Sequence, residues 1–190
     1  MNDNLKMAFA AVALAVASPS LATVAFAKTN VIVGGQEMFP TKTIVENAVN
    51  SADHTTLVTA VKAAGLVDTL SSKGPFTVFA PVNAAFAELP TGTVDTLLKP
   101  ENKDKLTGVL TYHVVAGRIT ARDLKKRIEK GHGKAVLKTV AGGTLTATLN
   151  GPNNVVIKDE SGNAANITIY DVMQSNGVIH SIDQVLLPKS

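Results

Sequence analysis

Apolar residues in the first part of the chain recur at the spacing of short helices. After Pro40 they fall on one helical face over residues 44–49 and again over residues 57–64, as expected when a helix buries one stripe of its surface. Asp53 stands where it can cap the second helix, and Gly65 stands where it can end it. The pattern predicts that two short helices open the domain.

A second set of elements follows in the middle of the chain. The β-branched and aromatic run 76–80 predicts a strand, and Asn83 is placed to cap a helix that begins after it. Helical spacing then predicts short helices over 94–98 and 103–110. They lead into Thr-Tyr-His-Val-Val at 111–115, whose residues favour an extended conformation and predict a short strand.

The helix that precedes the last third of the chain carries its own start signal. Thr120 followed three residues later by Asp123 is typical of a capping pair. Leu124 and Ile128 would then face inward from a helix over residues 121–130, while lysines and arginines face water.

The remainder alternates between strand-like runs and turn sequences. The turns are Gly-Gly, Asn-Gly-Pro and Ser-Gly-Asn, which suit hairpins. The predicted strands cover residues 136–140, 144–149, 155–159, 165–170 and 178–187. Helices followed by strands predict an α+β fold, with an antiparallel sheet covered by the earlier helices.

The first 27 residues have the composition of a secretory signal peptide. A short polar stretch with Lys6 precedes an apolar run over residues 7–17, and the segment closes on Ala-Phe-Ala. The apolar run is far below the roughly 20 residues of a spanning helix. We predict a signal peptide over 1–27, a flexible leader over 28–39 and one domain over 40–188, exported to the periplasm or the extracellular space.

Composition narrows the class of function. The chain has no cysteine and no tryptophan, and aromatic residues make up 4%, so neither disulfides nor a stacking platform for sugars or single-stranded nucleic acid is expected. The net charge of +3 is uneven, because residues 118–138 hold eight cations and two acids. The predicted basic patch consists of Arg118, Arg122, Lys125, Lys126, Arg127 and Lys130.

This basic patch has two interpretations. The simpler one is a solvated helix face, in which the charges serve only solubility. The sharper one is binding to acidic polysaccharide or to lipid headgroups. Binding of that kind should collapse with added salt, because screening weakens exposed charges first.

The sequence contains none of the common catalytic motifs that can be recognised from residue spacing. The sequence has no serine-hydrolase elbow, no zinc-protease helix motif, no phosphate loop and no dinucleotide fingerprint. The histidines stand singly, without a second ligand at a zinc-like offset; they are His54, His113, His132 and His180. We predict no enzymatic activity, no metal and no cofactor, although scattered histidines can converge in space.

Tyr112 and His113 need a separate interpretation. In a regular strand neighbouring side chains point to opposite faces, so only one of the two would enter the core. A buried one must be hydrogen-bonded, since an unpaired polar group costs about 1–3 kcal/mol. We interpret the pair first as a strand anchor and second as a contact site. His180, with apolar neighbours, is interpreted as a core residue.

Three segments together resemble the fasciclin (FAS1) domain family. Residues 76–86, Phe-Thr-Val-Phe-Ala-Pro-Val-Asn-Ala-Ala-Phe, resemble its first signature, and residues 176–188, Asn-Gly-Val-Ile-His-Ser-Ile-Asp-Gln-Val-Leu-Leu-Pro, resemble its second. A Tyr-His motif of the family lies between them. The resemblance implies a FAS1 fold, a β-sandwich-like wedge with several short helices packed over it. Its structural motif residues would be Asn83, Phe86, His180 and Asp183.

The resemblance also implies a function. Family members occur in secreted and surface proteins and are associated with adhesion; in animal members, integrin recognition is attributed to the Tyr-His region and to an Asp-Ile pair. The matching positions here are Tyr112, His113, Asp171 and Val172. The chain resembles a single-domain secreted bacterial member. The expected partner is a protein or polysaccharide on a cell, matrix or envelope surface, and not nucleic acid.

Two alternatives stand beside an adhesion module. Some family members resemble carriers of apolar pigments, and the β-rich half of the chain offers a place for an apolar groove, although the low aromatic content weighs against a flat ligand. The other alternative is a structural protein of the envelope.

Overall fold

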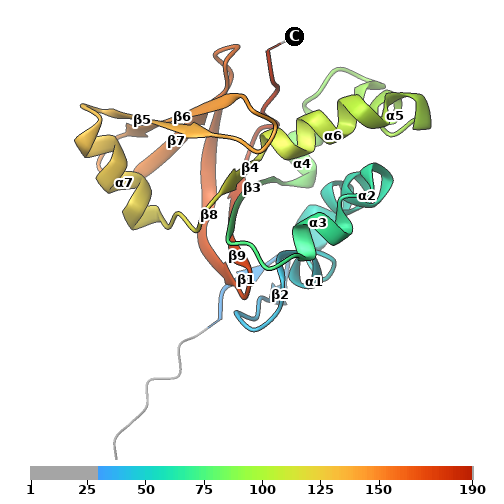
Figure 1. The fold of residues 1–190 in the computed structure, drawn as a ribbon, viewed down its shortest axis with the longest axis horizontal. Coiled ribbons are helices and arrows are strands. Elements are labelled where there is room, and N and C mark those ends of the chain that lie inside the picture. The colour runs from blue at the N-terminus through green and yellow to red at the C-terminus, as the bar shows by residue number, and fades with distance from the viewer. Residues whose placement is uncertain (1–29, 190) are drawn as a thin grey trace, which may run out of the picture.

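Two strands about 100 residues apart in the sequence lie side by side at the centre of the domain (Figure 1). The computed structural model describes residues 30–189, so the predicted signal peptide over 1–27 lies outside the described residues. β3 (Phe76–Pro81) pairs in parallel with β9 (Gly177–Ile182). Nearly all residues of both strands are buried, which explains why their sequences are largely apolar rather than alternating.

These two strands are the second and third of a seven-stranded sheet in the order β4-β3-β9-β8-β7-β6-β5. Every neighbouring pair except β3 and β9 is antiparallel. The antiparallel pairing predicted for the strands over 136–187 is confirmed. The parallel pair with β3 adds to it, because a hairpin from β8 lays β9 beside β3 in the same direction. The other strands are β4 (Val114–Ala116), β5 (Lys134–Lys138), β6 (Thr144–Asn150), β7 (Asn154–Lys158) and β8 (Ala164–Gln174).

The sheet bends so that its two edge strands approach each other. Val115 of β4 forms a β-bridge with Thr139, just beyond the end of β5. The amide of Val140 also donates to the carbonyl of Val114, with 2.8 Å between nitrogen and oxygen. One seven-stranded sheet with several short helices gives the α+β fold class that the sequence predicts.

Helices occupy both sides of this sheet. Figure 1 shows α1 to α6 on the side of β3 and β4, and α7 on the opposite side beneath β5, β6 and β7. The helical elements are α1 (Ile44–Ala48), η1 (Ala52–His54), α2 (Thr55–Ala64), α3 (Val67–Ser71), α4 (Asn83–Ala87), α5 (Thr93–Leu97), η2 (Pro100–Asn102), α6 (Lys103–Tyr112) and α7 (Ala121–Lys130). The predicted helices are present within about two residues at each end, whereas α3 and the two 3₁₀ turns have no counterpart among the predictions.

Apolar side chains form two clusters, one on each face of the central strands. Phe79 of β3 joins a cluster with α7 and β5 to β7, whereas its neighbours Val78 and Ala80 join a cluster with α1, α2, α3 and α6. Alternation along one buried strand therefore supplies both cores. The first cluster includes the predicted inward residues of α7, Leu124 and Ile128, and each contributes about 1.5–3 kcal/mol by its burial.

The segment 28–39, predicted as a flexible leader, contains regular structure. β1 (Ile32–Val33) and β2 (Gln36–Glu37) form an antiparallel hairpin. Val33 and Met38 are each only 3% exposed, and both belong to the cluster under the first helices. The prediction of a flexible leader is wrong for its described part, residues 30–39.

Gly34 and Gly35 form the turn between β1 and β2. Both have positive φ, 58° and 74°, as the two-residue turn of a hairpin requires. A Cβ atom on Gly34 would also approach the backbone nitrogens of Ala52 and Asp53 to 2.6 Å. The glycine pair thus forms the tight turn that lets the hairpin pack on η1.

Signals at the helix ends are confirmed in two places and wrong in one. Thr120 and Asp123 form the predicted capping box of α7, and Gly65 ends α2 in the left-handed conformation. Asp53 does not cap α2, because it lies inside the 3₁₀ turn η1 and His54 occupies the cap position. The extra turn moves the start of the helix beyond the reach of the aspartate.

Asn83 does cap a helix, but a different one from the helix predicted. α4 begins at Asn83 itself, so its side chain is free to point elsewhere. Its Oδ1 accepts from the backbone N–H of Thr56 at 3.0 Å, and its Nδ2 donates to the carbonyl of Ala52 at 2.8 Å. Asn83 therefore supplies hydrogen bonds to backbone groups at the start of α2. The cap residue of that helix makes no side-chain hydrogen bond there.

Candidate functional site

Tyr112 and His113 lie at the end of a helix and not within a strand. Tyr112 is the last residue of α6, His113 follows it in a helical conformation, and β4 begins at Val114. The predicted strand over 111–115 is therefore wrong in its first half, and strand alternation does not separate the two rings. Both enter the interior, with Tyr112 fully buried and His113 only 3% exposed.

The Tyr112 hydroxyl joins α6 to the far side of the sheet. It donates to the carbonyl oxygen of Thr144 at 2.7 Å and accepts from the backbone N–H of Glu160 at 3.1 Å. Thr144 begins β6, and Glu160 lies in the turn between β7 and β8. The polar tip of a buried aromatic ring therefore satisfies two backbone groups at once.

The His113 ring bridges α6 and the C-terminal segment. Its Nδ1 lies 2.8 Å from the carbonyl oxygen of Val109, and its Nε2 accepts from the backbone N–H of Leu186 at 3.0 Å. One nitrogen must donate and the other accept, which requires the neutral ring with its proton on Nδ1. Burial lowers the pKa of His113 to about 4, in agreement with a neutral ring at physiological pH.

His180 lies within β9 and is fully buried. Its Nε2 lies 2.9 Å from the carbonyl oxygen of Ile119, and its Nδ1 accepts from the backbone N–H of Asp171 at 3.3 Å. The ring stacks on Phe79 at 5.7 Å and meets Tyr170 edge-on at 6.2 Å. Burial lowers the pKa of His180 as well, and its predicted role in the core is confirmed.

Asp171 and Val172 also face the interior. Val172 is 1% exposed, and Asp171 is half-buried with its Oδ1 accepting from the backbone N–H of Ala121 at 2.7 Å. Three of the four candidate contact residues are thus buried, and the fourth is already hydrogen-bonded. In this conformation, Tyr112, His113 and Val172 present no surface to a partner.

The other structural motif residues hold neighbouring elements together. Phe86 is half-buried against the cluster under the helices. Asp183 accepts from the backbone N–H of Asn166 at 2.7 Å and from its side-chain amide at 2.8 Å, which fixes the end of β9 to β8.

A buried histidine that the sequence does not single out lies under α2. His54 is 3% exposed; its Nδ1 lies 2.9 Å from the Ser51 hydroxyl and its Nε2 lies 3.3 Å from the Ser181 hydroxyl. Burial lowers the pKa of His54. No sequence signal joins His54 to Ser181, because 127 residues separate them.

The histidines of the described residues do not form a metal-binding site with other ligand residues. Within residues 30–189 no group of three His, Asp or Glu side chains is placed to hold a metal ion. His132 is exposed in the turn after α7, far along the chain from the buried rings. Every buried side-chain nitrogen and oxygen in the same range has a hydrogen-bond partner, which is typical of the interior of a native protein.

An apolar cavity of ≈ 50 Å³ lies between the first helices and the central strands. Its wall includes Met38, Ile44, Leu57, Val61, Leu110 and Ile179. The rings of His54 and His113 also reach it. The cavity is therefore on the helical side of the sheet, and not in the β-rich half where an apolar groove was expected.

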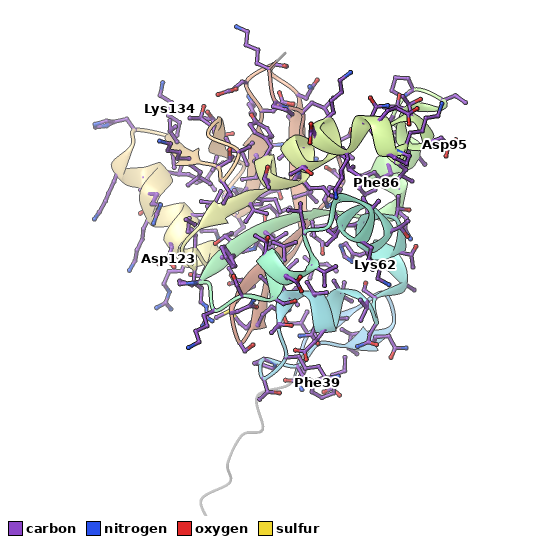
Figure 2. All side chains as sticks on the ribbon, turned by 45° about the vertical axis from the view of Figure 1, so that its right-hand side comes forward. Phe39, Lys62, Phe86, Asp95, Asp123 and Lys134 are labelled. Carbon is purple, nitrogen blue, oxygen red and sulfur yellow. The ribbon has the colours of Figure 1, made fainter. Side chains whose placement is uncertain are left out.

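The predicted basic patch divides into tethered and free cations. Arg118 donates to the carbonyls of Gln174 and Ser175 at 2.9 and 3.1 Å, and Lys125 donates to the side-chain oxygen of Asn153 at 2.9 Å. The others project from α7 into solvent; they are Arg122, Lys126, Arg127 and Lys130. Figure 2 shows nitrogen-tipped side chains along this helix, between the labelled Asp123 and Lys134.

The fold is an α+β domain. The buried polar side chains described above hold its helices and strands together through hydrogen bonds. Residues 52–188 match the family description Fasciclin domain. The chain belongs to the fasciclin domain family, which is generally non-enzymatic.

Two relatives and one solved structure show the range of this family. The chain is 51% identical over 146 residues to "Protein sll1483" of Synechocystis sp., covering 77% of this chain and 73% of the relative. It is 37% identical over 123 residues to the "Cell surface glycolipoprotein MPB83" of Mycobacterium bovis, covering 65% of this chain and 48% of that one. A FAS1 domain pair from the insect cell adhesion molecule Fasciclin I shares the fold, with a TM-score of 0.68 and 21% identity over 77% of this chain and 51% of that chain.

Within residues 30–189, no helix is long and apolar enough to cross a bilayer.

Proposed function

We propose that the protein is an exported, non-enzymatic interaction module that contacts a cell, matrix or envelope surface. The observation that carries this proposal is the division between a closed interior and a charged exterior. The buried polar atoms among the described residues are all hydrogen-bonded, whereas exposed cations gather on α7. A scaffold of this kind presents its outer surface to a partner and keeps its histidines for stability.

The names of relatives support the same reading. One relative is described as a cell surface glycolipoprotein, and one solved structure with this fold comes from a cell adhesion molecule. Contact in this protein would be made by exposed residues, because Tyr112 and His113 are enclosed. The matching animal motif would then act here through the architecture that it stabilises.

Attachment of cells tests the proposal. A strain that lacks the gene should attach less well to its natural surface, and the full-length protein supplied in trans should restore attachment. The mature protein should be recovered from the periplasm or the medium with Lys28 as its first residue. Unchanged attachment in the deletion strain, or retention of the uncleaved protein in the cytoplasm, would contradict the proposal.

The apolar cavity supports a second candidate, carriage of an apolar ligand. Its volume of ≈ 50 Å³ is about a third of an engineered apolar cavity of about 150 Å³ that accepts benzene. A pigment therefore requires α1, α2 and α3 to move away from the sheet. Protein purified from its natural source should then absorb visible light, and Ala48→Leu, which adds volume at the cavity wall, should lower the pigment content. A colourless preparation excludes the pigment.

A further inference from the structure

Three cations of α7 form a row on its exposed side. Arg122, Lys126 and Lys130 are spaced by four residues, so they lie about 6 Å apart along the helix axis, and all three are exposed. Leu124 and Ile128 on the opposite side are 0% and 1% exposed. Like charges at this spacing repel one another, so the row costs stability unless an anion binds there.

The two acids of α7 neutralise only part of this row, and Lys126 is the member that interacts with Asp123. The carboxylate of Asp123 accepts from the backbone N–H and the hydroxyl of Thr120 at 3.0 and 2.7 Å, and these hydrogen bonds lower the pKa of Asp123. It belongs to the helix cap at the first turn. Glu129 is the other acid of the helix, so positive charge dominates toward the C-terminal end, where the helix dipole favours cations.

The positive charge continues onto the edge of the sheet. β5 is an edge strand, and its Lys134 and Lys138 are exposed, whereas Ala135 and Leu137 between them face the core under α7. The two lysines therefore point to the side of β5 that lies away from α7. Figure 2 shows Lys134 close to the end of α7 that is opposite Asp123.

We propose that Arg122, Lys126, Lys130, Lys134 and Lys138, here called the basic edge, bind an extended acidic polysaccharide. This inference rests on the proposed function and names the chemistry of the partner. A flexible polyanion can pass around the Lys134 end of β5, away from the bridge between Thr139 and Val115, and so reach cations on both sides of the strand. Recognition would rely on charge, because the chain has no tryptophan and Tyr112 and Phe79 are buried, which leaves little surface for stacking on neutral sugars.

The geometry fits a polymer better than a membrane. Helices that lie on bilayers bury an apolar face in the lipid, whereas the apolar face of α7 is enclosed by the sheet. A flat bilayer can also reach only one side of the edge, so the α7 row and the β5 lysines could not both contact it. The two variant sets described below therefore separate the two partners.

Binding of the full-length mature protein to dextran sulfate and polygalacturonate tests the inference, with neutral dextran as the control ligand. The triple variant Arg122→Gln, Lys126→Gln, Lys130→Gln and the double variant Lys134→Gln, Lys138→Gln should each weaken polyanion binding by about tenfold or more at low salt. Both should also reduce its dependence on salt concentration. Glutamine is a good helix former, so unchanged thermal unfolding of the triple variant would show that α7 is intact.

A matched control removes three cations elsewhere. Lys99, Lys103 and Lys105 are exposed around η2 and α6, away from α7, so their triple change to Gln should leave binding within about twofold of the wild type. An equal loss in this control would overturn the inference, because net charge alone would then account for binding. Strong binding to phosphatidylglycerol vesicles that depends on only one of the two sets would overturn it in favour of a membrane surface.

Attachment assays separate this inference from the proposed function. If the wild-type protein restores attachment and the basic-edge variants restore it equally, the inference fails and the proposed function stands. If the wild-type protein does not restore attachment, the proposed function fails. Loss of both polyanion binding and attachment in the basic-edge variants, with both retained in the Lys99, Lys103 and Lys105 control, supports the inference.

Discussion

The Oδ1 of Asp171 accepts a hydrogen bond of 2.7 Å from the backbone N–H of Ala121, the first residue of α7. Asp171 has φ of +53° at a point where the register between β8 and β9 shifts, and its own N–H donates to His180. A carboxylate at a helix start meets both an unpaired N–H and the positive end of the dipole. The residue that resembles part of the animal recognition pair therefore fixes α7 to the sheet.

Asp171→Ala should destabilise the protein by about 1–2 kcal/mol, because a helix cap is lost and the left-handed backbone conformation disfavours alanine. Urea unfolding gives the free energy. Hydrogen exchange should show faster exchange at the first amides of α7 than in α2, because the missing acceptor loosens α7 first.

Asp171→Asn is the matched control, since it keeps an acceptor oxygen and tolerates positive φ. Its free energy of unfolding should fall by less than that of the alanine variant. The expected loss relative to the wild type is the charge–dipole contribution of about 0.3–1 kcal/mol. Equal losses in both variants would show that the hydrogen bond to α7 is unimportant.

Asn83→Ala should lower the free energy of unfolding by about 1–2 kcal/mol, because it removes the cap of α2 rather than a cap of its own helix α4. The side chain accepts from Thr56 and donates to Ala52, and loss of a cap typically costs about 1 kcal/mol. Urea unfolding checks the total, and hydrogen exchange of the first turn of α2 checks the location. Asn83→Asp keeps the acceptor and loses the donor, so an intermediate loss is expected; faster exchange confined to α4 would contradict this account.

Stability should fall as the pH drops from about 6.5 toward 4, because His113 is neutral in the folded protein. Burial holds the pKa of its ring at about 4, whereas the unfolded chain takes up the proton near 6.5. The unfolded state therefore binds more protons within this window, and acid favours it. The contribution of His113 is complete above pH 6.5 and has fallen by about 3 kcal/mol near pH 4.

The free energy of unfolding measured by urea at several pH values tests this window. His113→Gln cannot titrate, so its slope between pH 6 and 5 should be smaller than that of the wild type by about 1.2 kcal/mol per pH unit. His54 and His180 also have lowered pKa values, so part of the slope should persist. An unchanged slope in His113→Gln would mean that its ring is protonated in the folded protein.

The order of helices and strands could be predicted because each element carries a local signal. The Thr120–Asp123 pair sets the start of α7, and Gly65 sets the end of α2. The parallel pairing of β3 with β9 has no such signal, because it depends on contacts about 100 residues apart. The hairpin at Gly34 was missed because two glycines suit both a flexible segment and a tight turn.

The candidate site was harder to predict than the fold. The sequence indicated that His180 is in the core, since its neighbours are apolar, but it placed Tyr112 and His113 on a strand when they end a helix. Val114 and Val115 favour an extended conformation, and this preference predicts a strand over all of residues 111–115. The backbone N–H groups that donate to Asp171 and Asn83 lie on distant elements, so local pattern could identify these residues but not the helices that they cap.

Tyr112→Phe should separate an anchor from a contact site. The substitution keeps the buried ring and removes the hydroxyl that donates to Thr144 and accepts from Glu160, which leaves two enclosed backbone groups unpaired. We expect a loss of about 2 kcal/mol in the free energy of unfolding, measured by urea, and attachment equal to the wild type per molecule of folded protein. Unchanged stability with lost attachment would make the hydroxyl a direct contact and contradict the anchor role.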